Sequence, residues 1–182
     1  MSEISERYGR LADAFAAKIA AVPADQWTGP TPCANWTARE LVTHVVSSQG
    51  IFLGFVGQSV DDAPSVDDDP LGAWTAARTV VQDGLEDPAR AGSEFEGSMG
   101  TMTFESAVDR FLAVDLAVHG WDLARAAGLD DRIDPSDIAH VRDVAEGFGE
   151  RMRSPQAFGP EVVPPPGADE QVKLLAFLGR RA

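Results

Sequence analysis

Residues 111–121 read FLAVDLAVHGW, an almost unbroken apolar run. A helix that is apolar on nearly every side is one that other elements surround, so the stretch predicts a helix at the centre of a bundle. We expect this helix to run from Thr103 to Ala127, with Gly128 just beyond its end. Only Asp115 and His119 interrupt the apolar run, and their spacing of four residues places them on one face.

The pair formed by Asp115 and His119 allows two interpretations. The two side chains can pair with each other or lie on a solvated strip, as surface pairs at this spacing often do. Their stripe continues into Phe111 and Val108, however, which are expected core positions. A buried carboxylate and imidazole without partners would cost several kcal/mol, so something should compensate them. A divalent cation could do so, since aspartate oxygen and neutral histidine nitrogen both ligate it.

A second helix adds a further candidate ligand, His44. The capping-box pattern of Thr37 and Glu40 begins this helix, and it should extend to about residue 56. The face that should point inward comprises Leu41, His44, Val45, Ser48, Phe52 and Phe55. A histidine on such a face can simply be a core residue bonded to a carbonyl. Together with Asp115 and His119, it would instead make a metal site with positions open for water or substrate.

The remaining elements predict an all-α protein. We expect a first helix over residues 4–22, an irregular turn over 27–36, and a crossover loop over 57–69. A third helix should begin at Asp69-Pro70 and stop before Pro88, with Leu71 and Trp74 on its buried stripe. Residues 89–102 carry a weak hairpin signal. This order matches a four-helix bundle with one long crossover.

The C-terminal part supplies extra helices. A fifth helix should start at Asp134-Pro135, and a short amphipathic helix should end a Pro-rich tail. We therefore divide the chain into a metal-binding helical bundle over 1–152 and a tail over 153–182 that packs on it.

Three other polar residues are further candidates for the site. The phase of the fifth helix places His140 on the surface. Cys33 lies in a Pro-flanked turn, and a small buried hydrophobe is favoured there over a reactive thiol. Asp122 could orient a ligand imidazole or could be a surface charge that pairs with Arg125.

Composition limits the class of function. The chain has 29 acidic and 15 basic residues, for a net charge of −14, which argues against nucleic acid and anionic membranes as partners. A single cysteine excludes an intramolecular disulfide and a Cys-rich zinc module. Because there is no signal pattern and no long apolar run, we expect a cytoplasmic protein that acts on a small molecule or thiol. The apolar faces of the first and last helices would also allow a homodimer.

Three stretches of the chain carry a resemblance to a known family. They are Trp27 with PTPCANWT at 30–37 and the following Leu41 and His44; DLAVHGWDLARAAG at 115–128; and the ending from Phe158-Gly-Pro through LLAFLGR at 174–180. These stretches resemble the mycothiol-dependent maleylpyruvate isomerase N-terminal domain family, within the DinB/YfiT-like superfamily.

The resemblance implies a DinB-like four-helix bundle whose metal ligands are His44, Asp115 and His119. It also implies a divalent metal, zinc first and nickel, iron or manganese as alternatives, with mycothiol as a co-substrate. The family's isomerase has Glu where this chain has Asp115, and it carries a further C-terminal domain. Only about thirty residues follow the fifth helix here, so we expect a reaction other than maleylpyruvate isomerisation.

Two functions of different classes follow. The first is a metal-dependent enzyme, of transferase, isomerase or hydrolase type, that acts with a thiol. The alternative is a non-catalytic bundle that binds a small ligand or dimerises and retains a vestigial metal site. A third interpretation, in which the three polar residues satisfy one another without metal, makes the site purely structural.

Overall fold

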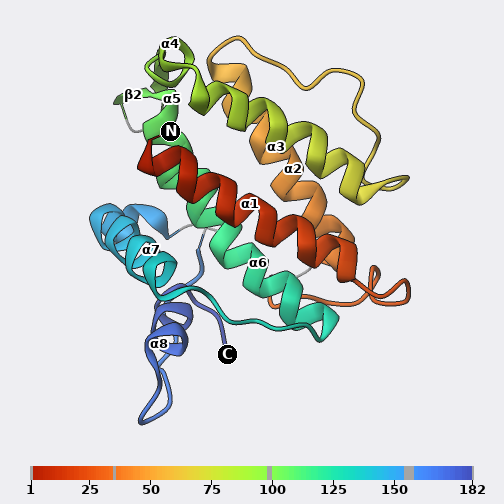
Figure 1. The fold of residues 1–182 in the computed structure, drawn as a ribbon. Helices are drawn as coiled ribbons and strands as arrows, with labels where there is room; N and C mark the ends of the chain where they lie inside the picture. The colour runs from red at the N-terminus through yellow and green to blue at the C-terminus, as the bar shows by residue number, and fades with distance from the viewer. Residues whose placement is uncertain (1, 35, 98–99, 154–157, 182) are drawn as a thin grey trace.

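Four long helices form the body of the protein in the computed structural model (Figure 1). They are α1 (Glu3–Ala21), α2 (Ala38–Phe55), α3 (Pro70–Glu86) and α6 (Ala113–Ala127). Helices α1 and α2 each pack against both α3 and α6, which closes the bundle around one apolar core. The structure describes residues 2–34, 36–97, 100–153 and 158–181. Asn35 of the family motif, residues 98–99 of the predicted hairpin and residues 154–157 of the tail therefore lie outside the described residues.

The long crossover follows from the directions of the helices. Helix α1 descends the bundle, α2 and α3 both ascend it, and α6 descends again (Figure 1). Because α2 and α3 run in the same direction, the chain must return along the bundle between them. The segment 57–69 makes this return, as the sequence predicted.

Side-chain caps fix where the helices begin. The backbone N–H of Glu40 donates to the Thr37 hydroxyl, and the Thr37 N–H donates to the Glu40 carboxylate at 2.8 Å, which completes the predicted capping box. Asp69 accepts from the N–H of Gly72 at 2.9 Å and begins α3 at Pro70. Each cap satisfies backbone donors that the first turn of a helix leaves free.

The central helix contains a π-helical segment that the sequence did not predict. Helix α5 (Phe104–Ala107) leads into η1 (Val108–Leu112), and α6 follows without a break. The expectation of one regular α-helix from Thr103 is thus corrected. A π turn holds one extra residue, so it changes the phase of the helix just before Asp115. The C-terminal end is as predicted, because Gly128 adopts a left-handed conformation with φ of 67°.

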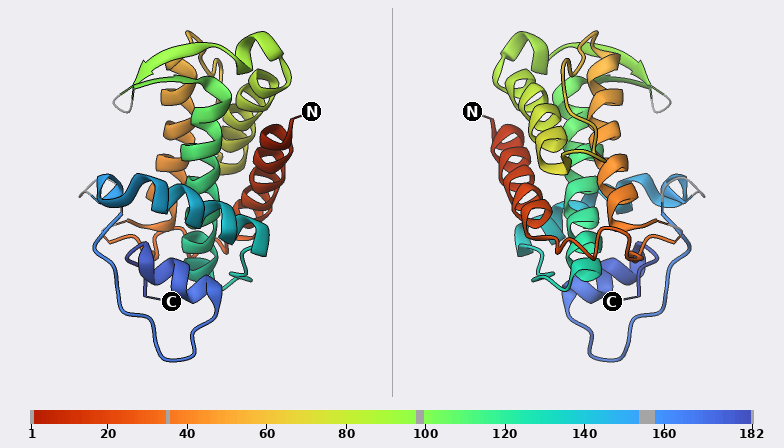
Figure 2. Two further views of the ribbon diagram at one scale, coloured as in Figure 1. Left: turned by 90° about the vertical axis from the view of Figure 1, so that its left-hand side faces the viewer. Right: turned by 90° about the vertical axis from the view of Figure 1, so that its right-hand side faces the viewer.

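A short hairpin covers one end of the bundle. Helix α4 (Pro88–Ala91) precedes β1 (Glu94–Gly97), which pairs antiparallel with β2 (Gly100–Thr103). Both side views in Figure 2 place this hairpin at the end of the bundle opposite α8. The weak hairpin signal in the sequence is therefore confirmed.

The C-terminal helices cover one side of the bundle and the end opposite the hairpin. Helix α7 (Pro135–Phe148) crosses α6 and continues into η2 (Gly149–Met152), and α8 (Glu170–Phe177) packs against α7 (Figure 2). Arg10 of α1 holds α7 in place, because its guanidinium donates to both oxygens of the buried Asp137 at 2.6 and 2.8 Å. The division of the chain at 152/153 remains a prediction.

Three sequence-based placements were wrong. His140 was expected on the surface, but its side chain is only 13% exposed and its ring lies 3.0 Å from the Asp109 carbonyl oxygen. The cause is that α7 lies across the central helix, so that its flank is covered as well as its apolar stripe. Leu71 and Phe55 were placed on buried stripes, yet they are 37% and 48% exposed. Both lie near helix ends; Phe55 stacks instead on Phe95 of the hairpin.

None of the helices in the described ranges is long and apolar enough to cross a membrane.

Candidate metal centre

The three predicted ligands come together where α2 packs on α6. His44 comes from the middle of α2, and Asp115 and His119 come from the first two turns of α6. His44 and Asp115 are partly exposed, whereas only 8% of the His119 side chain is exposed. The sequence could place each residue on an inward face, and the packing of the two helices makes those faces meet.

The carboxylate of Asp115 lies between the two imidazoles. Its Oδ2 is 3.4 Å from Nε2 of His44, and its Oδ1 is 3.3 Å from Nε2 of His119. The two rings are 5.2 Å apart and nearly perpendicular. Both imidazoles thus direct the same nitrogen, Nε2, toward one carboxylate.

These separations fit a shared cation better than direct hydrogen bonds. A tetrahedral ion with bonds of about 2.0–2.1 Å separates neighbouring ligand atoms by about 3.4 Å. Within the described residues, Oδ2 of Asp115 is buried and has no hydrogen-bond partner. A buried carboxylate oxygen without a partner is costly, so the residues present fit a divalent metal that would satisfy it.

Asp122 orients His119 from the other side of its ring. The His119 Nδ1 lies 3.0 Å from Oδ2 of Asp122, which is fully buried. A carboxylate here keeps the proton on Nδ1 and leaves Nε2 free as a ligand. The sequence left open whether Asp122 pairs with Arg125; in the structure Arg125 pairs with Asp131 instead.

Arg180 completes this buried arrangement, and sequence reasoning missed it. Its guanidinium donates to Oδ2 of Asp122 at 3.0 Å and to the Cys33 sulfur at 3.3 Å, and only 8% of the residue is exposed. Gly179 makes the preceding turn with φ of 81°, and a Cβ there would lie 3.0 Å from the Pro160 carbonyl oxygen. The turn therefore requires glycine, and it directs Arg180 back into the end of the bundle.

A second group of possible ligands lies next to the first. It consists of Cys33, His119 and Asp122, with the Cys33 thiol donating to Oδ2 of Asp122 at 3.1 Å. Arg180 already supplies a positive charge to this group. A divalent ion there would meet that charge at contact distance, so the group around Asp115 is the better candidate for the metal. Cys33 is half-buried: it packs against the core and also makes polar contacts with the neighbouring charged groups.

The charges of the site are strongly coupled. Burial opposes the charged form of His119, but Asp115 and Asp122 outweigh burial and hold the pKa of His119 well above its usual value. Burial likewise disfavours the Asp115 carboxylate, yet His119 and His44 outweigh it and lower the pKa of Asp115. Burial also opposes the charged form of Asp122, but the hydrogen bond to His119 and the charge of Arg180 outweigh burial and lower the pKa of Asp122.

A cavity of about 740 Å³ opens onto the three ligands. Its walls come from the turn before α2, from α2 itself, from the central helix, from α7 and from the C-terminal tail. Trp36 covers His44 on one side, with ring centroids 4.6 Å apart. A small molecule that enters this cavity reaches His44, Asp115 and His119, all of which line it.

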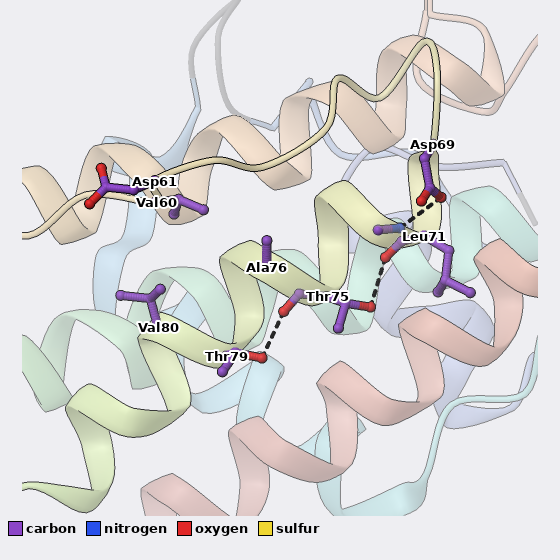
Figure 3. Close-up of a pocket in the computed structure, with 9 residues that line it drawn as sticks. Val60, Asp61, Asp69, Leu71, Thr75, Ala76, Thr79 and Val80 are labelled. Atoms are coloured by element: carbon purple, nitrogen blue, oxygen red, sulfur yellow. Dashed lines mark hydrogen bonds between the residues drawn. The ribbon is translucent and has the colours of Figure 1, made fainter.

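A second pocket, between the crossover and α3, lacks the features of a site (Figure 3). The hydroxyls of Thr75 and Thr79 donate to carbonyls one turn earlier in α3, and Asp69 caps the N–H of Gly72. These polar groups therefore already have hydrogen-bond partners within α3 and its N-cap.

Comparison with known proteins agrees with this picture. The sequence profile of the mycothiol maleylpyruvate isomerase N-terminal domain matches residues 8–124, which include all three candidate ligands. Uncharacterized proteins from two Mycobacterium tuberculosis strains, CDC 1551 / Oshkosh and ATCC 25618 / H37Rv, are each 32% identical over 173 residues, covering 94% of both chains. No solved structure matches the chain significantly. The matched region holds α2, α3 and most of α1 and α6, so the chain belongs to the mycothiol maleylpyruvate isomerase N-terminal domain family.

Proposed function

We propose that this protein binds a divalent metal through His44, Asp115 and His119 and uses it to act on a thiol. The observation that carries the proposal is the convergence of two Nε2 atoms on a carboxylate whose buried Oδ2 accepts no hydrogen bond from a described residue. The family's name makes mycothiol the first thiol to consider. A reaction of transferase or isomerase type fits a site of this kind.

The arrangement suits an open site more than a closed structural one. Three protein ligands leave at least one position of a tetrahedral ion for water or a thiol. The cavity lies against these ligands, and 34% of the His44 side chain is exposed. A structural metal would instead be enclosed by four protein ligands.

Each residue has a distinct task in this proposal. When bound, the metal would hold a thiol as its thiolate and lower its pKa. Asp122 holds the proton on Nδ1 of His119 and so directs Nε2 toward the ion. Arg180 fixes Asp122 from behind, and Trp36 packs over His44 and limits the access of water from that side.

The three ligands restrict the metal to a class of divalent ions and do not single out one element. Two imidazoles and a carboxylate suit zinc, and they also suit nickel, iron or manganese. We propose zinc first, because the separations of 3.4 and 3.3 Å between the Asp115 oxygens and the two Nε2 atoms match those of neighbouring ligands in four-coordinate geometry.

The metal-binding part of the proposal is tested by elemental analysis of protein purified without an affinity tag. We expect close to one equivalent of metal in the wild type and its loss in His44→Ala and His119→Ala. The matched control is His140→Ala, which removes a half-buried histidine of α7 outside the site and should retain the metal. Wild type that binds no metal at micromolar excess would contradict the proposal.

The catalytic part is tested separately with the metal-loaded protein. We expect metal-dependent consumption of mycothiol in the presence of an electrophile such as 1-chloro-2,4-dinitrobenzene. Stoichiometric metal without turnover across a broad panel of electrophiles would favour the alternative function, a non-catalytic module that binds a small ligand.

A further inference from the structure

We propose that the cavity beside the metal site binds an amphipathic carboxylate, with an apolar body against phenylalanine rings and its carboxylate held by Arg110 and Arg151. This inference deepens the proposed function and rests on it, because it names the substrate class that would meet the metal and the thiol.

One wall of the cavity is a row of aromatic rings. The rings of Phe52 and Phe111 have centroids 5.5 Å apart, and those of Phe111 and Phe148 are 5.4 Å apart and stacked. The three come from α2, η1 and α7, and all three line the cavity. A row that spans three elements offers a continuous apolar surface for a ligand of aromatic or aliphatic body.

The charge of the cavity is opposite to that of the protein. The chain carries a net charge of −14. Among the described residues that line the cavity, however, the charged side chains other than the imidazoles are Arg110, Arg151, Arg180 and a single carboxylate, Asp115. A cavity with this composition attracts anions and repels cations. A bound divalent ion would strengthen that preference.

Two of the three arginines are available to a ligand. Arg180 already binds Asp122, whereas Arg110 and Arg151 are exposed and form no ion pair with a described residue. Arg110 precedes Phe111 within the π-helical segment, so the helix presents a guanidinium and an aromatic ring to the cavity at adjacent positions. The fork of donors on a guanidinium matches the two oxygens of a carboxylate.

The test uses three probes that share one phenylalkyl body and differ in charge. They are 4-phenylbutyrate, 4-phenyl-1-butanol and 4-phenylbutylamine, titrated calorimetrically into the full-length protein with and without zinc. We expect the carboxylate to bind about tenfold more tightly than the alcohol, since charged hydrogen bonds to arginine contribute that much at a partly exposed site. The amine should bind most weakly.

Substitutions then locate the charge that is recognised. Arg110→Gln and Arg151→Gln should each weaken carboxylate binding by about three- to tenfold and leave alcohol binding unchanged. Arg132→Gln, which removes an exposed arginine outside the cavity, is the matched control and should change neither. All three positions are exposed, so the variants should fold, and circular dichroism checks this.

Equal affinity for the carboxylate and the alcohol, or no effect of either cavity variant, would overturn the inference. The outcome is distinguishable from failure of the proposed function. Zinc binding without carboxylate selectivity overturns only this inference, and carboxylate selectivity in a protein that binds no metal overturns the proposed function.

Discussion

Replacing Arg180 by methionine should destabilise the protein more than the loss of any other arginine in the C-terminal tail. Asp122 is fully buried and Arg180 is 8% exposed, so their contact at 3.0 Å is a buried ion pair. Methionine keeps much of the arginine stem but removes the charge, which leaves the buried carboxylate with hydrogen bonds from His119 and Cys33 alone.

The expected magnitude follows from this geometry. Breaking a buried pair from one side costs about 3–5 kcal/mol. Because Asp122 keeps its hydrogen bonds to His119 and Cys33, we expect the loss in free energy of unfolding to lie at the lower end of this range, at about 3 kcal/mol. With a urea m-value of about 2 kcal/mol/M, the midpoint should fall by about 1.5 M. Urea unfolding followed by tryptophan fluorescence measures this directly in the metal-free protein.

Arg153→Met is the matched control. Arg153 lies in the same part of the chain, but it donates to the carbonyls of Gly159 and Phe177 rather than to a carboxylate. Its loss should cost about 1 kcal/mol. The double variant Arg180→Met with Asp122→Asn should be more stable than the sum of the two single losses predicts, because it no longer leaves a buried charge unpaired.

A free energy of unfolding for Arg180→Met within about 0.5 kcal/mol of the wild type, or a loss no larger than that of Arg153→Met, would contradict this prediction. Either result would mean that the ion pair with Arg180 does not stabilise the buried carboxylate of Asp122.

Four further outcomes are expected. Tyr8→Phe should cost about 1–2 kcal/mol in urea unfolding, because the Tyr8 hydroxyl donates to the buried Gln49 side chain at 2.8 Å and its loss leaves that oxygen unsatisfied; an unchanged midpoint would contradict this. Thr37→Ala should cost about 1 kcal/mol by removing the N-cap of α2, and Thr37→Ser should restore most of it. The neighbouring carboxylates raise the pKa of His119 against the effect of burial, so zinc binding at pH 7 should displace its proton and weaken as the pH falls. Calorimetry in buffers of different ionisation enthalpy should then show about one proton released per zinc, and no release would show that His119 is already neutral. In the metal-free protein the charged His119 stabilises the fold fully below about pH 6.5, and this contribution is lost as the pH rises through the raised pKa of the folded state.

The parts of the site that sequence could predict are those that depend on helical periodicity. Asp115 and His119 share a face because they are four residues apart, and the apolar run around them indicates burial. His44 follows in the same way from the phase of the helix that Thr37 begins. The family motif then supplies the pairing of the two helices, which periodicity alone cannot give.

The parts that sequence could not predict depend on contacts between distant segments. Arg180 is 58 residues from Asp122, and its position requires the turn at Gly179 and the path of the Pro-rich tail. The burial of His140 depends on how α7 crosses the central helix. The π-helical turn leaves no clear mark in the hydrophobic pattern, because Val108 and Leu112 are buried in either kind of helix.

A divalent ion bound among His44, Asp115 and His119 can be located directly. The measurement is an anomalous difference map from crystals of the protein grown with zinc, recorded on both sides of the zinc absorption edge. We expect one strong peak within about 2.0–2.2 Å of both Nε2 atoms and of an Asp115 carboxylate oxygen. A peak at Cys33 and Asp122 instead, or no peak among the three residues at full zinc occupancy elsewhere, would contradict it.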